Sequence, residues 1–397
     1  MAERKELSKD VFYVGIKDYN RRMFDALVPL PYGTSYNSYL IKAEKPALID
    51  TVNPGFEEAW IKNIKAVLEP EEIAYVIMNH AEPDHAGSIP CILKLSPQAK
   101  LITSVKGKDM VMKFYRVPEE RIIAVKDNEE ISLGDKTLKF IEAPMLHWPE
   151  TMFTYLKEEN VLFTCDFMGF HTSSGFYDDD FKDLEFHAKR YYGEIMMPFS
   201  IMGKKALSKI SGLNISLICP SHGPVHKNPD RILSLYRSWT NSETKQKVII
   251  IYVTMWQNTE KMIDVITDKL LSNGIEVARH NLLNADIGDI AADLVDSRAI
   301  VFGSPTVLNS MHPMALYGIS LVKALKPPLK YAVLISSYGW LEAAIKEAKS
   351  LLSSSGIEIV AEKAVNRAVQ EEDLREVEQI ADDLIDKLKE KVTQDIR

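Results

Sequence analysis

Cysteine is scarce in this chain, which has three cysteines among 397 residues. Cys91, Cys165 and Cys219 lie far apart and form no CxxC pair. The sequence therefore encodes neither a disulfide framework nor a rubredoxin-type iron site. We interpret the three thiols as small buried hydrophobic groups.

Long apolar runs and basic stripes are also lacking. No run of about 18 apolar residues occurs, and the charged N-terminal segment MAERKELSKD has no apolar core of signal-peptide length. The formal net charge of -8 is spread along the chain, with no basic stripe interleaved with aromatic residues. We expect a cytoplasmic protein that binds neither nucleic acid nor membrane.

The first part of the chain reads as short strands with interleaved helices, which indicates a strand-rich α/β domain. The clearest strand segments are 38–50, 73–79, 100–104, 137–144 and 151–166, the last with a hairpin turn at 158–160. The polar segment 237–247 interrupts this pattern, so we assign residues 1–246 to a first domain and residues 247–397 to a second.

The second domain alternates regularly between apolar strands and helices. Strands are expected at 248–253, 275–280, 299–303, 331–336 and 357–362, and helices at about 259–273, 287–295, 313–325, 340–353 and 371–391. This order predicts a doubly wound parallel sheet. Such sheets bind ligands at the carboxyl ends of their strands.

Candidate metal ligands follow the expected strands of the first domain. The segment NHAEPDHAGS, residues 79–88, contains His80, Glu82, Asp84 and His85. Further candidates follow other strands: His147, Asp166 and His222. Because Pro83 disfavours helical geometry at Glu82, we expect this segment to be extended and irregular. A lone histidine or aspartate is often an ordinary loop residue, but seven groups at strand ends favour a metal site.

At these residues the chain resembles the metallo-β-lactamase superfamily and, within it, the flavodiiron proteins, also called A-type flavoproteins. Zinc hydrolases of the superfamily carry HxHxDH, whereas HAEPDH here has Glu82 at the second histidine position. Carboxylate-rich sites favour harder ions, so Glu82 favours redox iron over hydrolytic zinc. The resemblance implies an αββα sandwich followed by a flavodoxin-like domain.

The resemblance also implies roles for individual residues. One iron takes His80, Glu82 and His147, the other takes Asp84, His85 and His222, and Asp166 bridges them. In some flavodiiron proteins the histidine at the position of His85 turns away from the metal, so its rotamer stays open. Trp148, His171 and Tyr192 occupy family positions near the substrate pocket. Their role is either packing or proton delivery.

Three loops of the second domain resemble the FMN-binding loops of flavodoxins. TMWQNT (254–259) places hydroxyl, amide and backbone N–H groups at a helix N-terminus, which suits a phosphate without a lysine. GSPTVLN (303–309) and SSYGW (336–340) would flank the isoalloxazine. Neither GxxxxGK[ST] nor GxGxxG occurs. The expected FMN contacts are Thr254, Met255, Trp256, Asn258, Thr259, Ser304, Pro305, Thr306, Asn309, Ser337, Tyr338, Gly339 and Trp340.

The resemblance, which covers essentially the whole chain, implies reduction of dioxygen to water or of nitric oxide to nitrous oxide. Two alternatives are a zinc-dependent hydrolase with a regulatory flavodoxin domain and a non-catalytic electron carrier. We expect no rubredoxin or flavin-reductase extension, and therefore expect electrons from an external donor, either rubredoxin or a reduced deazaflavin. We expect a head-to-tail homodimer, with a dimer of dimers as the larger alternative.

Overall fold

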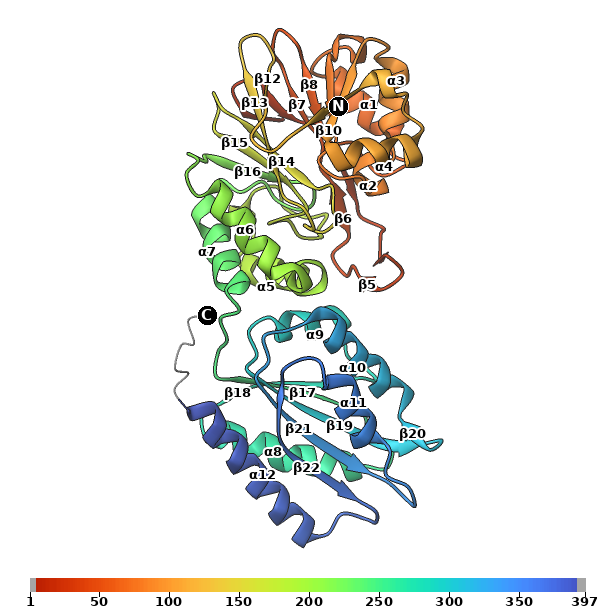
Figure 1. The fold of residues 1–397 in the computed structure, drawn as a ribbon, viewed down its shortest axis with the longest axis vertical. Helices are drawn as coiled ribbons and strands as arrows, with labels where there is room; N and C mark the ends of the chain where they lie inside the picture. Colours follow the sequence, from red (N-terminus) through yellow and green to blue (C-terminus); the bar gives the residue numbers. More distant parts are fainter. Residues whose placement is uncertain (1–4, 391–397) are drawn as a thin grey trace. The chain divides into compact units, whose positions relative to one another are not determined.

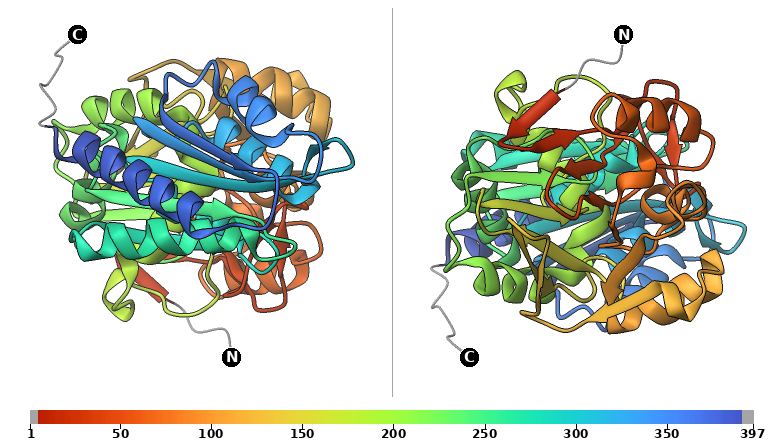
Figure 2. Two further views of the ribbon diagram at one scale, coloured as in Figure 1. Left: turned by 90° about the horizontal axis from the view of Figure 1, so that it is seen from below. Right: turned by 90° about the horizontal axis from the view of Figure 1, so that it is seen from above.

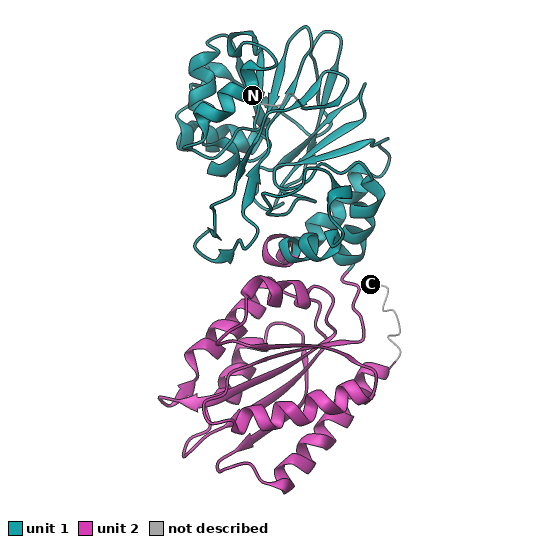
Figure 3. Ribbon diagram, turned by 180° about the vertical axis from the view of Figure 1, so that it is seen from behind, with its two compact units in different colours: residues 1–192, 199–241 teal, residues 193–198, 242–397 magenta. Residues whose placement is uncertain are grey.

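The computed structural model describes residues 5–390, and these fall into two compact units (Figures 1 and 3). The first unit comprises the chain up to Tyr192 together with Phe199–Asn241. The second comprises Gly193–Pro198 together with the chain from Ser242 onward. The domain boundary between residues 246 and 247 remains our proposal.

Two sheets form the centre of the first unit. The seven-stranded sheet has the order β1 (Lys5–Ser8), β2 (Val11–Tyr13), β7 (Tyr39–Ile41), β8 (Ala47–Ile49), β9 (Tyr75–Ile77), β10 (Lys100–Ser104), β11 (Ile122–Val125). The five-stranded sheet has the order β12 (Glu130–Ser132), β13 (Thr137–Glu142), β14 (Met152–Leu156), β15 (Val161–Cys165), β16 (Leu217–Pro220). Two small pairs are β3 (Ile16–Asp18) with β6 (Thr34–Tyr36), and β4 (Met23–Phe24) with β5 (Val28–Pro29). Strands form in all five expected segments, and the hairpin turn after β14 is confirmed, but the segment 38–50 holds two antiparallel strands, β7 and β8, with a turn between them.

The helices of the first unit are α1 (Glu57–Lys65), α2 (Pro83–Ala86), α3 (Ile89–Leu95), α4 (Val105–Tyr115), α5 (Leu184–Tyr191), α6 (Ser200–Ile210) and α7 (Pro229–Thr240). Helices α1, α3 and α4 lie on one side of the two sheets, and α5, α6 and α7 lie on the other (Figure 1). The polar segment expected at 237–247 is shorter, because α7 continues to Thr240.

Alternation along the central strands builds this sandwich, because successive side chains point to opposite faces. Val76 of β9 packs in the cluster shared with α1, α3 and α4, whereas the next residue, Ile77, packs between the two sheets. Leu101 and Ile102 of β10 divide in the same way. On the other sheet, Phe167 stacks on Phe153 of β14 and meets an aromatic ring of α7. The expected αββα sandwich is confirmed.

The second unit is the expected doubly wound sheet. Its parallel strands have the order β18 (Glu276–Asn281), β17 (Lys247–Tyr252), β19 (Ala299–Val307), β21 (Tyr331–Ser337), β22 (Glu358–Val365), with the short β20 (Ser310–Met311) paired to β19. Its helices are α8 (Asn258–Ser272), α9 (Ile287–Leu294), α10 (Pro313–Leu325), α11 (Ala344–Leu352) and α12 (Glu371–Lys389). Helices α8 and α12 lie side by side on one face of the sheet, while α9, α10 and α11 cover the other (Figures 1 and 2).

Two helix boundaries differ from expectation. Helix α11 begins at Ala344 and not near residue 340, so Trp340 lies in an exposed loop. Helix α12 ends at Lys389 within the described residues, whereas residue 391 lies outside them. None of the described helices is long and apolar enough to cross a membrane.

Candidate functional site

The seven candidate ligands of the first unit gather where its strands end. His80 and Glu82 follow β9, His147 lies in the loop after β13, and Asp166 and His222 follow β15 and β16. Glu82 is extended, with φ -63 and ψ 142, as expected of a residue before proline. The expectation of an irregular segment is wrong beyond that point, because proline is favoured in a first helical turn and Pro83 begins the short helix α2. That helix carries Asp84 and His85.

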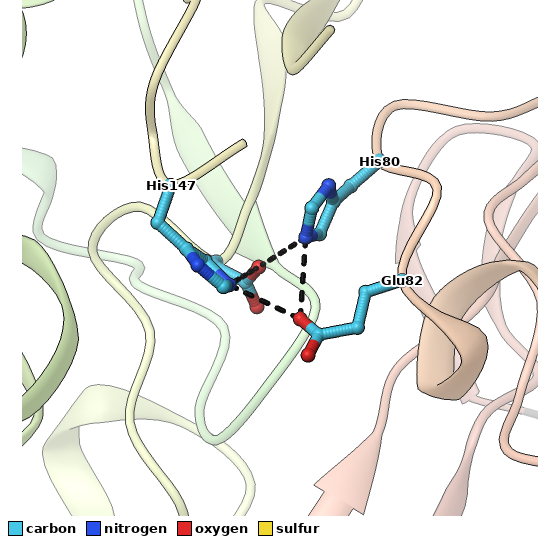
Figure 4. Close-up of side chains that lie close together, drawn as sticks. His80, Glu82 and His147 are labelled. Atoms are coloured by element: carbon cyan, nitrogen blue, oxygen red, sulfur yellow. Dashed lines mark hydrogen bonds and ion pairs between the residues drawn. The ribbon is translucent and has the colours of Figure 1, made fainter. Parts of the chain in front are cut away.

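Glu82 stands at the centre of a first group of ligands. Its Oε2 lies 3.2 Å from Nε2 of His80 and 3.1 Å from Nε2 of His147. Figure 4 shows these three side chains pointing toward one another, His80 and Glu82 from the loop after β9 and His147 from the loop after β13. Oδ2 of Asp166 lies 3.6 Å from the His80 nitrogen and 3.7 Å from the His147 nitrogen.

A second group forms around Asp84. Its Oδ2 lies 3.1 Å from Nε2 of His222, and its Oδ1 lies 3.4 Å from Nε2 of His85. Oδ1 of Asp166 lies 3.0 Å from the His85 nitrogen and 3.5 Å from the His222 nitrogen. His85 therefore points into the cluster, and the two oxygens of Asp166 face one group each.

The hydrogen bonds behind these histidines fix which ring nitrogen faces the cluster. Nδ1 of His222 lies 2.6 Å from the carbonyl oxygen of Ser35, which can only accept, so Nδ1 carries the proton. Nδ1 of His80 donates in the same way to the buried carboxylate of Glu150 at 2.7 Å. In the neutral rings each Nε2 then presents a lone pair to carboxylate oxygens. Both Asp84 oxygens are buried and accept no hydrogen bond from any described residue.

Lone pairs on both sides of a short gap repel one another unless a cation lies between them. This arrangement fits metal ions, because ligating histidines characteristically donate their other N–H to a carboxylate or a carbonyl. The pKa values of the histidines also indicate a site for positive charge. Burial lowers the pKa of His85, but the charges of Asp84 and Asp166 raise it overall to about 9. Burial also acts against the protonated form of His80, yet hydrogen bonds to Glu150 and Glu82 raise its pKa well above the usual value. The cluster therefore stabilises positive charge.

The residues expected near the substrate pocket divide into two sets. The Trp148 ring lies 5.0 Å from that of His80, and the His171 ring lies 4.4 Å from that of His222. Burial and the nearby His222 lower the pKa of His171 well below its usual value, so this ring is neutral. Tyr192 instead bonds to Ser200 and packs against aromatic rings of α7.

Several residues at the cluster were not expected from the sequence. Tyr191, the neighbour of Tyr192, packs 5.0 Å from the His171 ring. Thr34 Oγ1 lies 2.9 Å from Nδ1 of His171. Glu150, which supports His80, also accepts the backbone N–H of Ala81 at 2.8 Å. The only sequence signal for Glu150 is its place three residues after His147, and the other two have none.

The second unit contains a pocket of about 640 Å³ at the carboxyl ends of its strands. Ten expected contacts line it: Met255, Trp256, Asn258, Pro305, Thr306, Asn309, Ser337, Tyr338, Gly339 and Trp340. Three expected residues do not line the pocket, namely Thr254, Thr259 and Ser304. Further lining residues were not expected: Val307, Leu308, Leu341, Asn366 and Arg367.

Of the three residues outside the lining, Thr254 lies in the loop after β17, Thr259 in the first turn of α8 and Ser304 in β19. Thr259 Oγ1 bonds to Ser337 Oγ at 3.0 Å, and Ser304 Oγ donates to the carbonyl of Pro305 at 2.8 Å. The Thr259 hydroxyl thus joins the first turn of α8 to the end of β21, whereas the Ser304 bond is local to β19. Thr254 Oγ1 is buried and has no hydrogen-bond partner among the described residues.

One feature of the pocket fits the phosphate group of a flavin mononucleotide, and another fits its planar ring. No described side chain caps the N-terminus of α8, where the backbone N–H groups of a first turn attract anions. At the rim, the side chains of Trp256 and Trp340 are 81% and 87% exposed. Exposed flat apolar side chains beside an anion site suit an amphipathic ligand with a planar ring.

Fold and site together define a protein with a metallo-β-lactamase-like metal-binding domain and a flavodoxin-like domain.

A family model described as "ODP family beta lactamase" matches residues 34–223. A nitric oxide reductase of Moorella thermoacetica is 36% identical over 91% of this chain and 92% of its own length. A flavo-diiron protein of Clostridium acetobutylicum is 34% identical over 86% of this chain and 88% of its own length. The solved rubredoxin oxygen:oxidoreductase of Desulfovibrio gigas matches with a TM-score of 0.95 at 28% identity, covering 98% of this chain and 99% of that chain. The chain belongs to the flavodiiron protein family.

Proposed function

We propose that this chain reduces dioxygen to water, or nitric oxide to nitrous oxide, at two non-haem irons held by the seven-residue cluster. One relative is named nitric oxide reductase, and a solved relative is named rubredoxin oxygen:oxidoreductase. Electrons would pass through FMN in the pocket of the second unit. An iron pair can bind and reduce a small diatomic molecule, and a flavin can exchange electrons singly or in pairs.

The observation that carries this proposal is the position of Asp166 between the two groups of ligands. Its Oδ2 faces His80 at 3.6 Å, and its Oδ1 faces His85 at 3.0 Å. One carboxylate would thus ligate both irons and keep them together. In the pocket, the first turn of α8 and Thr254 would bind the FMN phosphate, and Trp256 and Trp340 would lie beside the ring.

A zinc-dependent hydrolase is not favoured. Glu82 replaces the second histidine of the hydrolase pattern and gives the cluster a third carboxylate, which suits iron better than zinc. A flavin-only electron carrier would have no use for seven converging ligands. We further propose a cytoplasmic enzyme that takes electrons from rubredoxin or a reduced deazaflavin.

The test begins with the composition of the purified protein. We expect about two irons and one FMN per chain. The anaerobically reduced protein is then exposed separately to dioxygen and to nitric oxide, and turnover is measured with each donor. Two zincs and no flavin would contradict the proposal, and so would a reduced protein that both gases fail to reoxidise.

We also propose a head-to-tail homodimer in which the FMN of one chain faces the irons of its partner. Only residues 241–246 connect α7 to β17, and an isologous pairing brings each flavin pocket to a partner's cluster. Larger assemblies would be dimers of this dimer.

Subunit mixing tests the dimer. A chain that cannot bind FMN, through bulky substitutions at Thr254 and Asn258, is exchanged with a chain that carries Asp166→Ala. Electron transfer between chains predicts that the mixed dimer recovers a substantial part of the turnover. Exchange without recovered activity would contradict the head-to-tail arrangement.

A further inference from the structure

The pocket of the second unit includes a positively charged side chain that the strand-end motifs did not predict. Arg367 lines it from the loop between β22 and α12, next to Asn366. We propose that Arg367 binds the phosphate group of the flavin, so that the pocket selects flavin mononucleotide over unphosphorylated riboflavin. This inference rests on the proposed function, because it assumes that the pocket binds a flavin.

The loop that carries Arg367 is fixed to the start of helix α8. Oδ1 of Asn258, the first residue of α8, accepts the backbone N–H of Val369 at 3.2 Å. Helices α8 and α12 follow parallel strands and lie side by side, so their N-termini lie at the same edge of the sheet (Figure 2). Arg367 therefore lies beside the α8 N-terminus, where we place the phosphate.

Two acidic side chains hold the guanidinium group in place. Its Nη1 lies 2.9 Å from Oδ2 of Asp373, which is buried, and its Nη2 bonds to Glu372. Both acids lie in the first turn of α12. A guanidinium has five N–H donors, so donors remain for a phosphate oxygen. An ordered side chain loses less conformational entropy on binding than a mobile one.

The other groups at this end of the pocket offer hydrogen bonds but only partial positive charge, so a full charge beside them would strengthen phosphate binding. The first turn of α8 offers a partial charge of roughly half a unit, whereas a phosphate monoester carries about -1.5 to -2. The unpartnered hydroxyl of Thr254 supplies a hydrogen bond but no charge. Among the residues that line the pocket, Arg367 is the only cationic side chain.

The experiment compares two ligands that differ only in the phosphate. The full-length chain is stripped of flavin and titrated with FMN and with riboflavin, and binding is followed by quenching of flavin fluorescence. For Arg367→Met we expect about tenfold weaker FMN binding, as for the loss of one charge-assisted hydrogen bond, and riboflavin binding within about twofold of wild type. Added salt should weaken FMN binding less in this variant than in wild type.

Two further variants separate charge at the site from general effects. Arg367→Lys keeps the charge and should recover part of the FMN affinity. Arg375→Met makes the same charge change on α12, at an exposed residue paired with Glu371, and should leave both affinities unchanged.

Three results would contradict the inference. Equal weakening of FMN and riboflavin binding by Arg367→Met would show that Arg367 supports the ring or the loop. Unchanged FMN binding would show that the phosphate is held without it. A wild-type chain that bound neither flavin would contradict the proposed function itself, and the inference would fall with it.

Discussion

Replacing Asp166 by asparagine tests the metal cluster most directly. The side chain keeps its shape but loses its charge, and one oxygen becomes an NH₂ group that cannot bind a metal ion. The two carboxylate oxygens lie 3.0–3.7 Å from the four histidine Nε2 atoms. Asp166→Asn therefore removes a ligand from one group and negative charge from both.

The size of the effect follows from this double role. Changing a residue that only supports a metal ligand typically costs about 10–100-fold in affinity. Because Asp166 faces both groups directly, we expect a loss of more than roughly 100-fold. Iron should fall from about two per chain to less than one, while FMN stays near one. The flavin pocket is spared because it is lined only by residues of the second unit.

Iron is measured by chelation colorimetry and flavin by absorbance after unfolding. A matched control is Asp178→Asn, at an equally buried carboxylate whose oxygens accept the backbone N–H groups of Lys227 and Asn228. That variant should lose about 1–3 kcal/mol of unfolding free energy but keep both irons. An Asp166→Asn protein with two irons and unchanged gas reduction would refute the bridging role.

Three other substitutions probe the chemistry around the two cofactors. Glu82→His should keep a metal site, measured by metal analysis, but slow gas reduction, because it restores the hydrolase ligand pattern; a wild-type rate would contradict our account of Glu82. Glu150→Gln should weaken the metal on the His80 side by about 10–100-fold in chelator competition, because the amide holds the His80 N–H less strongly, and equal loss of both irons would argue against this. Trp340→Ala should change the unfolding free energy by no more than about 0.5 kcal/mol, since the side chain is 87% exposed. The same variant should weaken FMN binding about 2–10-fold in fluorescence titration, and unchanged binding would remove Trp340 from the ring site.

The architecture and the metal cluster could be predicted because they depend on the order of strands and loops. Strand segments buried on both faces are largely apolar, and this made β9, β15 and β17 easy to recognise. Polar residues directly after such strands gather at one edge of the sheet. His80 and Asp166 follow strands of the two different sheets, β9 and β15, and these strand ends meet at the same end of the sandwich, so the two side chains lie 3.6 Å apart although their numbers differ by 86.

The neighbours of the cluster could not be predicted, because they depend on helix phase and on contacts between loops. Tyr191 and Tyr192 are adjacent in sequence, but one residue turns the side chain by about 100° around a helix axis. Tyr191 faces His171, and Tyr192 faces α7. No periodicity in the sequence indicates where α5 ends or how it is rotated. Arg367 escaped notice for the same reason, because its loop reaches the pocket through tertiary contacts such as the hydrogen bond from the Val369 N–H to Oδ1 of Asn258.

Glu150 shows how the supports of a metal site differ from its ligands. It follows His147 by three residues, yet its carboxylate binds Nδ1 of His80, at the end of a different strand. The same oxygen accepts the N–H of Ala81, so Glu150 fixes both the ring and the backbone of the loop that carries Glu82. A metal ligand can be predicted from its position at the end of a strand, which sequence patterns reveal. The residue that supports it lies in the loop of another strand, and that loop must lie at the right height beside the first. The relative position of the two loops is set by packing between the two sheets, so Glu150 could be recognised as a support only from the structure.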